Sequence, residues 1–188
     1  MVDFLVMYHG AVMPGRCIES IIDLLKINLR IGAVILGDGS LEYKKKLQNY
    51  ADQEKVGDRL IYHAAVANSE LWKYVGAVDV GLILATASSP NMLYSLPNKF
   101  FENIQSETPV ICPFYPAMKE LVDRYGIGMT CDPEDIDSIH ECVEKLRTDH
   151  QFYHLCKQNV RKAKRELCWE KEKNNLATAY KLYVGLGG

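Results

Sequence analysis

Short, almost wholly apolar runs alternate with amphipathic stretches along most of this 188-residue chain, and this alternation constrains the fold more than any other feature. Brief apolar runs are typical of parallel strands that are buried on both faces. The pattern predicts a single doubly wound, Rossmann-like α/β domain, in which helices cover both faces of a parallel sheet. The predicted strands are Phe4–Tyr8, Ile31–Leu36, Arg59–Tyr62, Val78–Ile83, Pro109–Cys112 and Gly128–Cys131.

The segments between these runs predict helices, and the tail from about 150 to 184 predicts two more, with a break near Cys168 and Trp169. In doubly wound sheets, ligands bind beyond the carboxyl ends of the strands. The loops expected to carry function are therefore His9–Gly15, Gly37–Ser40, His63–Ala67, Leu84–Leu96 and Pro113–Pro116. The helices predicted before the tail are Arg16–Leu29, Leu41–Gln53, Glu70–Val75, Pro97–Gln105, Ala117–Tyr125 and Ile136–Leu146.

Charge and composition narrow the function classes. The chain has 22 Lys and Arg against 24 Asp and Glu, so no global field attracts nucleic acid, and any anion site must be local. The six cysteines lie far apart without metal-site spacing, which favours reduced thiols, most of them buried. No signal peptide and no apolar run of about 18 residues appears, so we expect a cytoplasmic protein without a membrane span.

The segment from Leu96 to Glu102 has the chemistry of a nucleotide site. Pro97 is expected at the first helical position, where the free N–H groups of the first turn and the helix dipole favour a phosphate. Glu102, one turn later, can accept hydrogen bonds from both hydroxyls of a ribose. The alternative is a helix that begins with proline and carries a solvated Lys99 and Glu102.

Two earlier loops add weaker signals. After the first strand, Gly10 permits close approach to a ligand and Arg16 offers a fork of donors to a diphosphate, although a plain turn with a surface arginine fits equally well. The sequence from Gly37 to Ser40 begins like a dinucleotide fingerprint but lacks its third glycine. A tight turn with Ser40 as N-cap is favoured there.

Taken together, the order and spacing of these motifs resemble the C-terminal, nucleotide-sugar-binding half of GT-B glycosyltransferases, specifically the retaining family 4. The resemblance runs from Phe4 to about Tyr183. The family's Gly-Arg and Lys-Gly pairs fall on Gly10-Ala11 and Arg16-Cys17, and the second of its two spaced glutamates falls on Glu102.

The resemblance implies a donor site for a UDP-sugar or GDP-sugar that needs no metal, and transfer of a hexose to a glycan or lipid-linked acceptor. Arg16 would take the role of the family's lysine and neutralise the leaving diphosphate, and Glu102 would bind the ribose. The backbone of Leu96, Pro97 and Asn98 would line the phosphate and sugar pocket.

Three positions depart from the family pattern. Ala11 stands where the family has an arginine, and Lys99 is the candidate replacement as a catalytic cation. Tyr94 stands where a glutamate normally contacts the donor sugar, which leaves the sugar open. Cys17 replaces a glycine, a change expected to cost little inside a helix start.

Some polar residues have two interpretations. His9 either faces the phosphates or sugar of the donor or is a polar residue at a strand end without a role. His63 either contacts the nucleobase or contacts only its own loop. The acidic stretch that includes Asp135 and Asp137 is interpreted as a helix start, with Asp132 as N-cap, and not as a metal site.

The first predicted strand begins almost at Met1, which leaves no room for the N-terminal, acceptor-binding half of a GT-B enzyme. We therefore expect a donor-binding domain over residues 1–188 that transfers no sugar in isolation, has an exposed face that favours dimers in crystals, and belongs to an enzyme that could lie peripherally at a membrane. A GT-B-like nucleotide-sugar epimerase half and a non-catalytic nucleotide-binding module are the alternatives.

Overall fold

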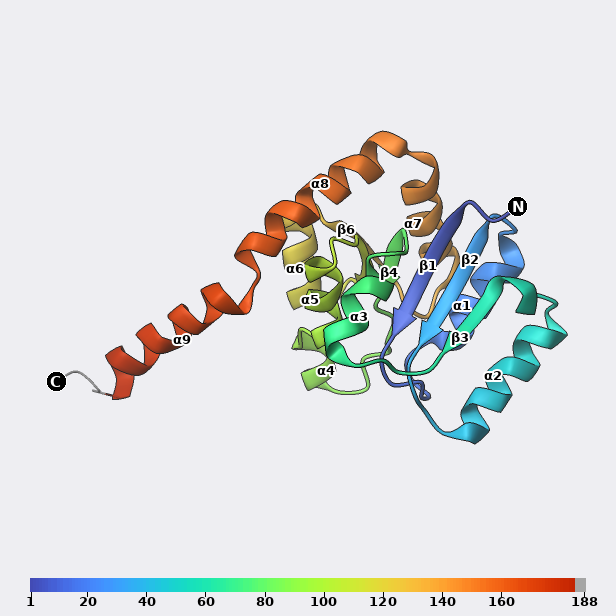
Figure 1. The fold of residues 1–188 in the computed structure, drawn as a ribbon, viewed down its shortest axis with the longest axis horizontal. Helices are drawn as coiled ribbons and strands as arrows, with labels where there is room; N and C mark the ends of the chain where they lie inside the picture. Colours follow the sequence, from blue (N-terminus) through green and yellow to red (C-terminus); the bar gives the residue numbers. More distant parts are fainter. Residues whose placement is uncertain (185–188) are drawn as a thin grey trace.

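The computed structural model describes residues 1–184 and contains a six-stranded, wholly parallel sheet in the order β3-β2-β1-β4-β5-β6 (Figure 1). The predicted fold class and all six predicted strands are confirmed. Residues 185–188 of the predicted domain lie outside the described part. The strands are β1 (Phe4–His9), β2 (Ile31–Leu36), β3 (Leu60–His63), β4 (Val80–Leu82), β5 (Val110–Pro113) and β6 (Gly128–Cys131).

Helices follow the strands, and two more close the described chain. The break between the last two, at Cys168, is confirmed. One helix, α4, lies inside a segment predicted as loop; Ser89 caps it by accepting a hydrogen bond from the Met92 N–H at 3.4 Å. The helices are α1 (Ile18–Ile27), α2 (Leu41–Gln53), α3 (Asn68–Val75), α4 (Pro90–Tyr94), α5 (Asn98–Gln105), α6 (Pro116–Tyr125), α7 (Ile136–Thr148), α8 (His150–Glu166) and α9 (Trp169–Val184), with a short 3-10 turn η1 (Gly57–Arg59).

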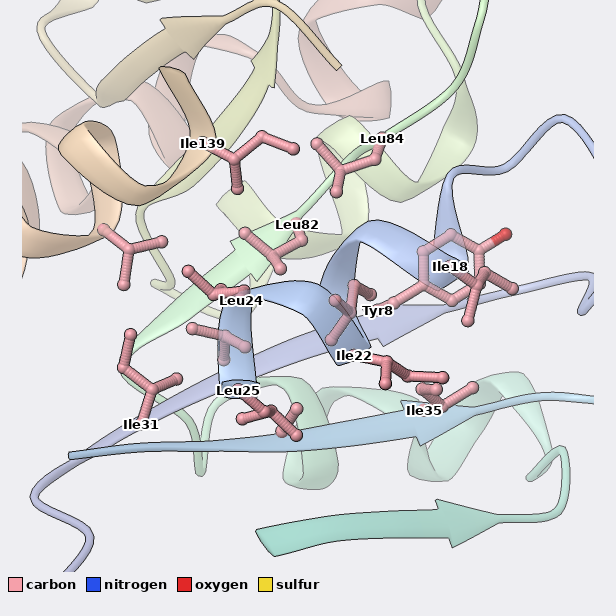
Figure 2. Packing of buried hydrophobic residues seen from close by; sticks show 14 of the residues in the cluster. Tyr8, Ile18, Ile22, Leu24, Leu25, Ile31, Ile35, Leu82, Leu84 and Ile139 are labelled. Atoms are coloured by element: carbon pink, nitrogen blue, oxygen red, sulfur yellow. The ribbon is translucent and has the colours of Figure 1, made fainter. Parts of the chain in front are cut away.

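Successive strand residues point to opposite faces, so β1 contributes to two apolar layers. Val6 and Tyr8 are fully buried in one apolar cluster with Ile18 and Ile22 of α1. Figure 2 shows these two isoleucines on the same side of the sheet as Tyr8. Met7 belongs to a separate cluster with Val75 and Val78, on the side of α3. Each such aliphatic side chain contributes about 1.5–3 kcal/mol through burial, so the sheet is held from both sides.

The strand order reverses between β1 and β4. From β1 the chain builds outward through β2 to β3, and it then returns to add β4, β5 and β6 on the other side of β1. The helices that follow the two central strands belong to different apolar clusters, because α1 packs with β1 and β2 whereas α5 packs with β5. The loops after β1 and β4 therefore diverge and leave a crevice at their carboxyl ends.

Two glycines allow the loops after β1 and β2 to interlock. A Cβ at Gly37 would lie 1.9 Å from the carbonyl oxygen of Gly10, and one at Gly39 would lie 1.8 Å from that of Val12. The Val12 N–H donates to the Asp38 carbonyl at 2.9 Å. The Gly-Asp-Gly sequence is thus explained by backbone contact, and Ser40 caps α2 as predicted, accepting from the Tyr43 N–H at 3.2 Å.

The last helix lies apart from the sheet. Figure 1 shows α8 crossing the domain edge and α9 continuing away from it. Every α9 residue from Trp169 to Tyr183 is exposed, including Trp169, Tyr180 and Leu182. The described part of the domain therefore buries none of the α9 side chains between those two residues.

Several predicted helix starts are shifted. The helix predicted from Arg16 begins at Ile18, and those predicted from Glu70 and Ala117 begin at Asn68 and Pro116. Pro97 is the N-cap of α5 and not its first helical residue, since its ψ of 150° is extended. Asp135, not Asp132, caps α7, and its carboxylate accepts from the Asp137 N–H at 3.0 Å. Asp132 instead accepts from the Glu134 N–H and closes a turn, because a three-residue spacing of acidic residues offers two equivalent caps.

The expectation that Cys17 costs little is wrong. Cys17 is not inside the helix; it is the residue before α1 and has φ 48° and ψ 40°, the left-handed region that glycine prefers. A non-glycine residue held there is strained by about 1–2 kcal/mol. Burial raises the pKa of its thiol to about 11, so Cys17 is neutral at physiological pH.

We predict that Cys17→Gly has a larger free energy of unfolding than Cys17→Ala, by about 1 kcal/mol, because only glycine removes the left-handed strain. Urea denaturation followed by circular dichroism measures the difference. The matched control is Cys156, a buried cysteine inside α8, where alanine should exceed glycine by about 0.5–1 kcal/mol. If the alanine variant were the more stable of the two at both positions, the proposed strain at Cys17 would be contradicted.

Candidate functional site

Three charged side chains predicted as site residues lie at the crevice between β1 and β4. Arg16 comes from the loop after β1, whereas Lys99 and Glu102 come from α5. Arg16 and Glu102 both act on Lys99 electrostatically, the first lowering and the second raising its pKa. Residues 86 positions apart in the chain thus meet at one edge of the sheet.

Lys99 crosses over the end of β1. Its ammonium lies 3.9 Å from the centre of the Tyr8 ring, close enough for a cation–π contact. A Cβ placed on Gly10, whose φ is +118°, would meet the Lys99 Nζ at 3.4 Å. Glycine at position 10 therefore both adopts a backbone conformation closed to other residues and leaves space for the lysine.

The electrostatics of Lys99 favour an incoming anion. The pKa of Lys99 is lowered from 10.5 to about 7, mainly by burial and next by Arg16, whose effect exceeds the opposite effect of Glu102. Burial also raises the pKa of Tyr8 to about 12, so the ring beneath the ammonium is neutral. Two cations with insufficient negative charge between them are stabilised when a phosphate binds.

Arg16 and Lys99 line the same small pocket. It has a volume of about 60 Å³ and opens between the loops after β4 and β5. Tyr115 helps to shape it, because its hydroxyl donates to the Ala85 carbonyl at 2.9 Å and holds the loop after β4 in place. The other lining residues are Ile83, Leu84, Met92, Ser95, Pro97, Pro113 and Met118.

The backbone predicted to contact a phosphate lies at the start of α5. In the described chain no side chain caps this helix, and Pro97 brings no N–H of its own. The Phe100 N–H is bonded to the Pro97 carbonyl at 2.9 Å. The N–H groups of Asn98 and Lys99 remain for a ligand, next to an exposed Leu96.

Glu102 is paired with His9, the last residue of β1. The His9 Nε2 lies 3.0 Å from the Glu102 Oε2, and the two side chains are 3% and 36% exposed. The sequence left His9 open between a ligand contact and no particular role. Only the fold reveals this pairing, since 93 positions separate the two residues.

His63 lines a different hollow, at the carboxyl ends of β2 and β3. Its Nδ1 lies 2.7 Å from the Ala64 carbonyl, and its ring lies 4.9 Å from that of Tyr74. The hollow has a volume of about 310 Å³. Val12, Gly37, Lys44, Lys45, Gln48 and Tyr62 line the rest of it. His63 is therefore near the crevice edge but not among the charged residues around Lys99.

Sequence reasoning missed the aromatic supports of the site. The sequence gives Tyr8 only as part of a predicted strand, yet its hydroxyl donates to the Ala11 carbonyl at 2.7 Å, and the Lys99 ammonium lies over its ring. An aromatic residue at the carboxyl end of a central strand is the signal that could have indicated this. Ala11 itself is exposed and supplies no charge.

In residues 1–184 no group of His, Cys, Asp and Glu side chains is placed to hold a metal ion. No helix in that range is long and apolar enough to cross a membrane.

A family model described as glycosyl transferases group 1 matches residues 5–163. A comparison with curated proteins found no match. Among solved structures, HepE of Anabaena in complex with UDP and glucose has a TM-score of 0.81 at 18% identity and covers 96% of this chain and 48% of its own. Sucrose-phosphate synthase of Thermosynechococcus elongatus has a TM-score of 0.85 at 16% identity, with 98% and 46% covered.

A third structure is itself an isolated half. The C-terminal domain of the group 1 glycosyl transferase LpcC of Francisella tularensis has a TM-score of 0.70 at 18% identity and covers 85% of this chain and 83% of its own. The present chain spans about half the length of HepE and of the synthase. It therefore belongs to the glycosyl transferases of group 1 and has the fold of the C-terminal half of a GT-B enzyme.

Proposed function

We propose that this domain binds a UDP-sugar or GDP-sugar and is the donor half of a retaining glycosyltransferase that transfers a hexose to a glycan or lipid-linked acceptor. The observation that carries the proposal is the meeting of two cations, Arg16 and Lys99, with the carboxylate of Glu102 at the switch in strand order. A nucleoside diphosphate has the complementary charges and hydroxyls in one molecule. HepE, which shares the fold, was crystallised with UDP.

Each residue then has a chemical role. Arg16 and Lys99 neutralise the diphosphate as it leaves the sugar, which is where negative charge builds up in the transition state. The free N–H groups of Asn98 and Lys99 hold phosphate oxygens beside Leu96 and Pro97.

The nucleoside part of the ligand lies beyond the diphosphate and makes different contacts. Glu102 accepts hydrogen bonds from the ribose hydroxyls, and Gly10 lets the ligand approach the end of β1. His63 borders the hollow next to β2 and β3, which we assign to the nucleobase. Lys99 takes over the charge that an arginine at the position of Ala11 would have supplied.

The two alternatives make different demands on the same residues. An epimerase half would need an acid and a base close to the sugar, and His9 is already held by Glu102. A non-catalytic nucleotide-binding module would need Glu102 but not the paired cations. The clustering of Arg16 and Lys99 therefore favours the transferase.

We predict that Arg16→Ala weakens UDP and GDP by on the order of tenfold or more, and leaves uridine and guanosine unchanged, because the guanidinium contacts only the diphosphate. Glu102→Ala should weaken nucleosides and diphosphates by similar factors. Calorimetry for the diphosphates and ligand-observed NMR for the nucleosides give the affinities, with ADP as a third diphosphate.

The control for these titrations is Arg124→Ala, which removes an exposed arginine that is paired within α6. It should leave every affinity unchanged. Equal losses of nucleoside and diphosphate binding in Arg16→Ala would contradict the assigned contact. Full UDP and GDP affinity in that variant would favour the non-catalytic module.

Diphosphate affinity should fall as pH rises from 7 to 8.5, by on the order of tenfold, because Lys99 has a pKa of about 7 in the free domain and binds phosphate only when protonated. The sign follows from the charge: below pH 7 the ammonium is present, and above it binding must also take up a proton. Lys99→Arg should flatten the profile, since a guanidinium stays charged. A flat profile for the unmodified domain would rule out this role, and uridine serves as the phosphate-free control.

The 188 residues alone should bind the donor but transfer no sugar, because the chain spans about half of HepE, a relative of the same fold. Incubation with UDP-glucose and GDP-mannose in the presence of glycan and lipid extracts, followed by mass spectrometry of the products, tests this. The control is each donor with the extracts and no protein. Glycosylated product above that background would overturn the proposal that a second half is required.

A further inference from the structure

His9 stands out among the buried polar residues of the described chain. It is 2% exposed at the carboxyl end of the central strand, and its Nε2 contacts Glu102 at 3.0 Å. Its second nitrogen, Nδ1, is buried and has no partner among the described groups. An apolar side chain would avoid that unsatisfied nitrogen, so a histidine here needs another reason.

The direction of the hydrogen bond follows from the carboxylate. An ionised glutamate only accepts hydrogen bonds, so the His9 Nε2 must carry a hydrogen and donate a hydrogen bond to the Glu102 Oε2. In the tautomer with hydrogen on Nε2 alone, Nδ1 is an acceptor. The contact with Glu102 thus selects the tautomer in which Nε2 carries the hydrogen and Nδ1 is left without a partner.

This contact holds a side chain that would otherwise rotate. Glutamate has three rotatable bonds, and the Glu102 side chain is 36% exposed, so little packing restrains it. A carboxylate has about four acceptor positions, and His9 occupies one. The remaining positions suffice for two neighbouring hydroxyls, and a carboxylate fixed beforehand loses less entropy when it binds them.

We infer that His9 is a positioning residue that orients Glu102 and thereby sets the preference of the site for ribose over 2′-deoxyribose. The inference rests on the proposed function, since it names the group that prepares Glu102 for the ribose. His9 acts through the carboxylate and needs no contact with the nucleotide.

The test compares UDP, GDP and ADP with their 2′-deoxy counterparts by calorimetry. The unmodified domain should prefer the ribose form by on the order of tenfold. His9→Leu, which keeps the volume but removes the donor, should bring that ratio close to one while inorganic pyrophosphate binds as before. His9→Gln should retain most of the preference, because its amide can donate to the same oxygen.

Two further variants keep the result interpretable. Adding His9→Leu to Glu102→Ala should change the ratio no further, since both act through one carboxylate. If His9→Leu fails to fold by circular dichroism, His9→Asn replaces it, because its amide is too short to reach Glu102. A merely structural histidine would change the melting temperature of these variants without changing the ratio.

The outcomes separate the inference from the function beneath it. If the unmodified domain binds none of the three diphosphates, the proposed function fails. If it binds them with a ribose preference that a folded His9→Leu or His9→Asn variant retains, only the role of His9 is overturned. Loss of the preference in His9→Leu and its recovery in His9→Gln support the inference.

Discussion

The reversal of strand order between β1 and β4 is the constraint on which the rest of the domain depends. Two parallel strands that run side by side but lead to helices in different apolar clusters must send their loops apart. The loop that follows β1, which begins at the exposed Gly10, is thereby left accessible, while the strand itself is buried on both sides. The last two strand residues, Tyr8 and His9, and the glycine that follows them all contact α5 residues: Tyr8 supports Lys99, His9 binds Glu102, and Gly10 gives Lys99 its space.

The charge distribution at this edge explains why the site suits an anion although the whole chain is slightly acidic. Arg16 and Lys99 face a single carboxylate, and burial weakens the hold of Lys99 on its own proton. A diphosphate would supply the missing negative charge and stabilise both cations. The family's usual arginine is absent at Ala11, and the lysine reaches the same strand end from the opposite side of the crevice. In the proposed function, Lys99 supplies the charge that the motif lacks at Ala11.

The loop that carries Arg16 is held by backbone contacts as well as by the burial of Val12 in the core. Gly37 and Gly39 let the loop after β2 touch it, the Gly15 carbonyl accepts from the Thr86 N–H at 3.2 Å, and Cys17 is held in a left-handed conformation at the entry to α1. Such strain persists only where the surrounding structure over-determines the backbone. In the proposed function, an arginine on a loop of this kind needs little reorganisation before it contacts the diphosphate, as we infer for Glu102 held by His9.

The sequence by itself determined the fold class, all six strands and the break at Cys168, because apolar periodicity and turn residues act over neighbouring positions. It also indicated Arg16, Lys99 and Glu102, since cations and carboxylates near helix starts follow local rules. The sequence did not determine the N-cap of α7, because Asp132 and Asp135 both fit that position. Only the tertiary structure decided that Tyr8 supports Lys99, that His9 pairs with Glu102, and that Cys17 is strained. Those facts depend on residues brought together from distant strands and helices, and on backbone angles imposed by neighbouring loops, neither of which a local pattern contains.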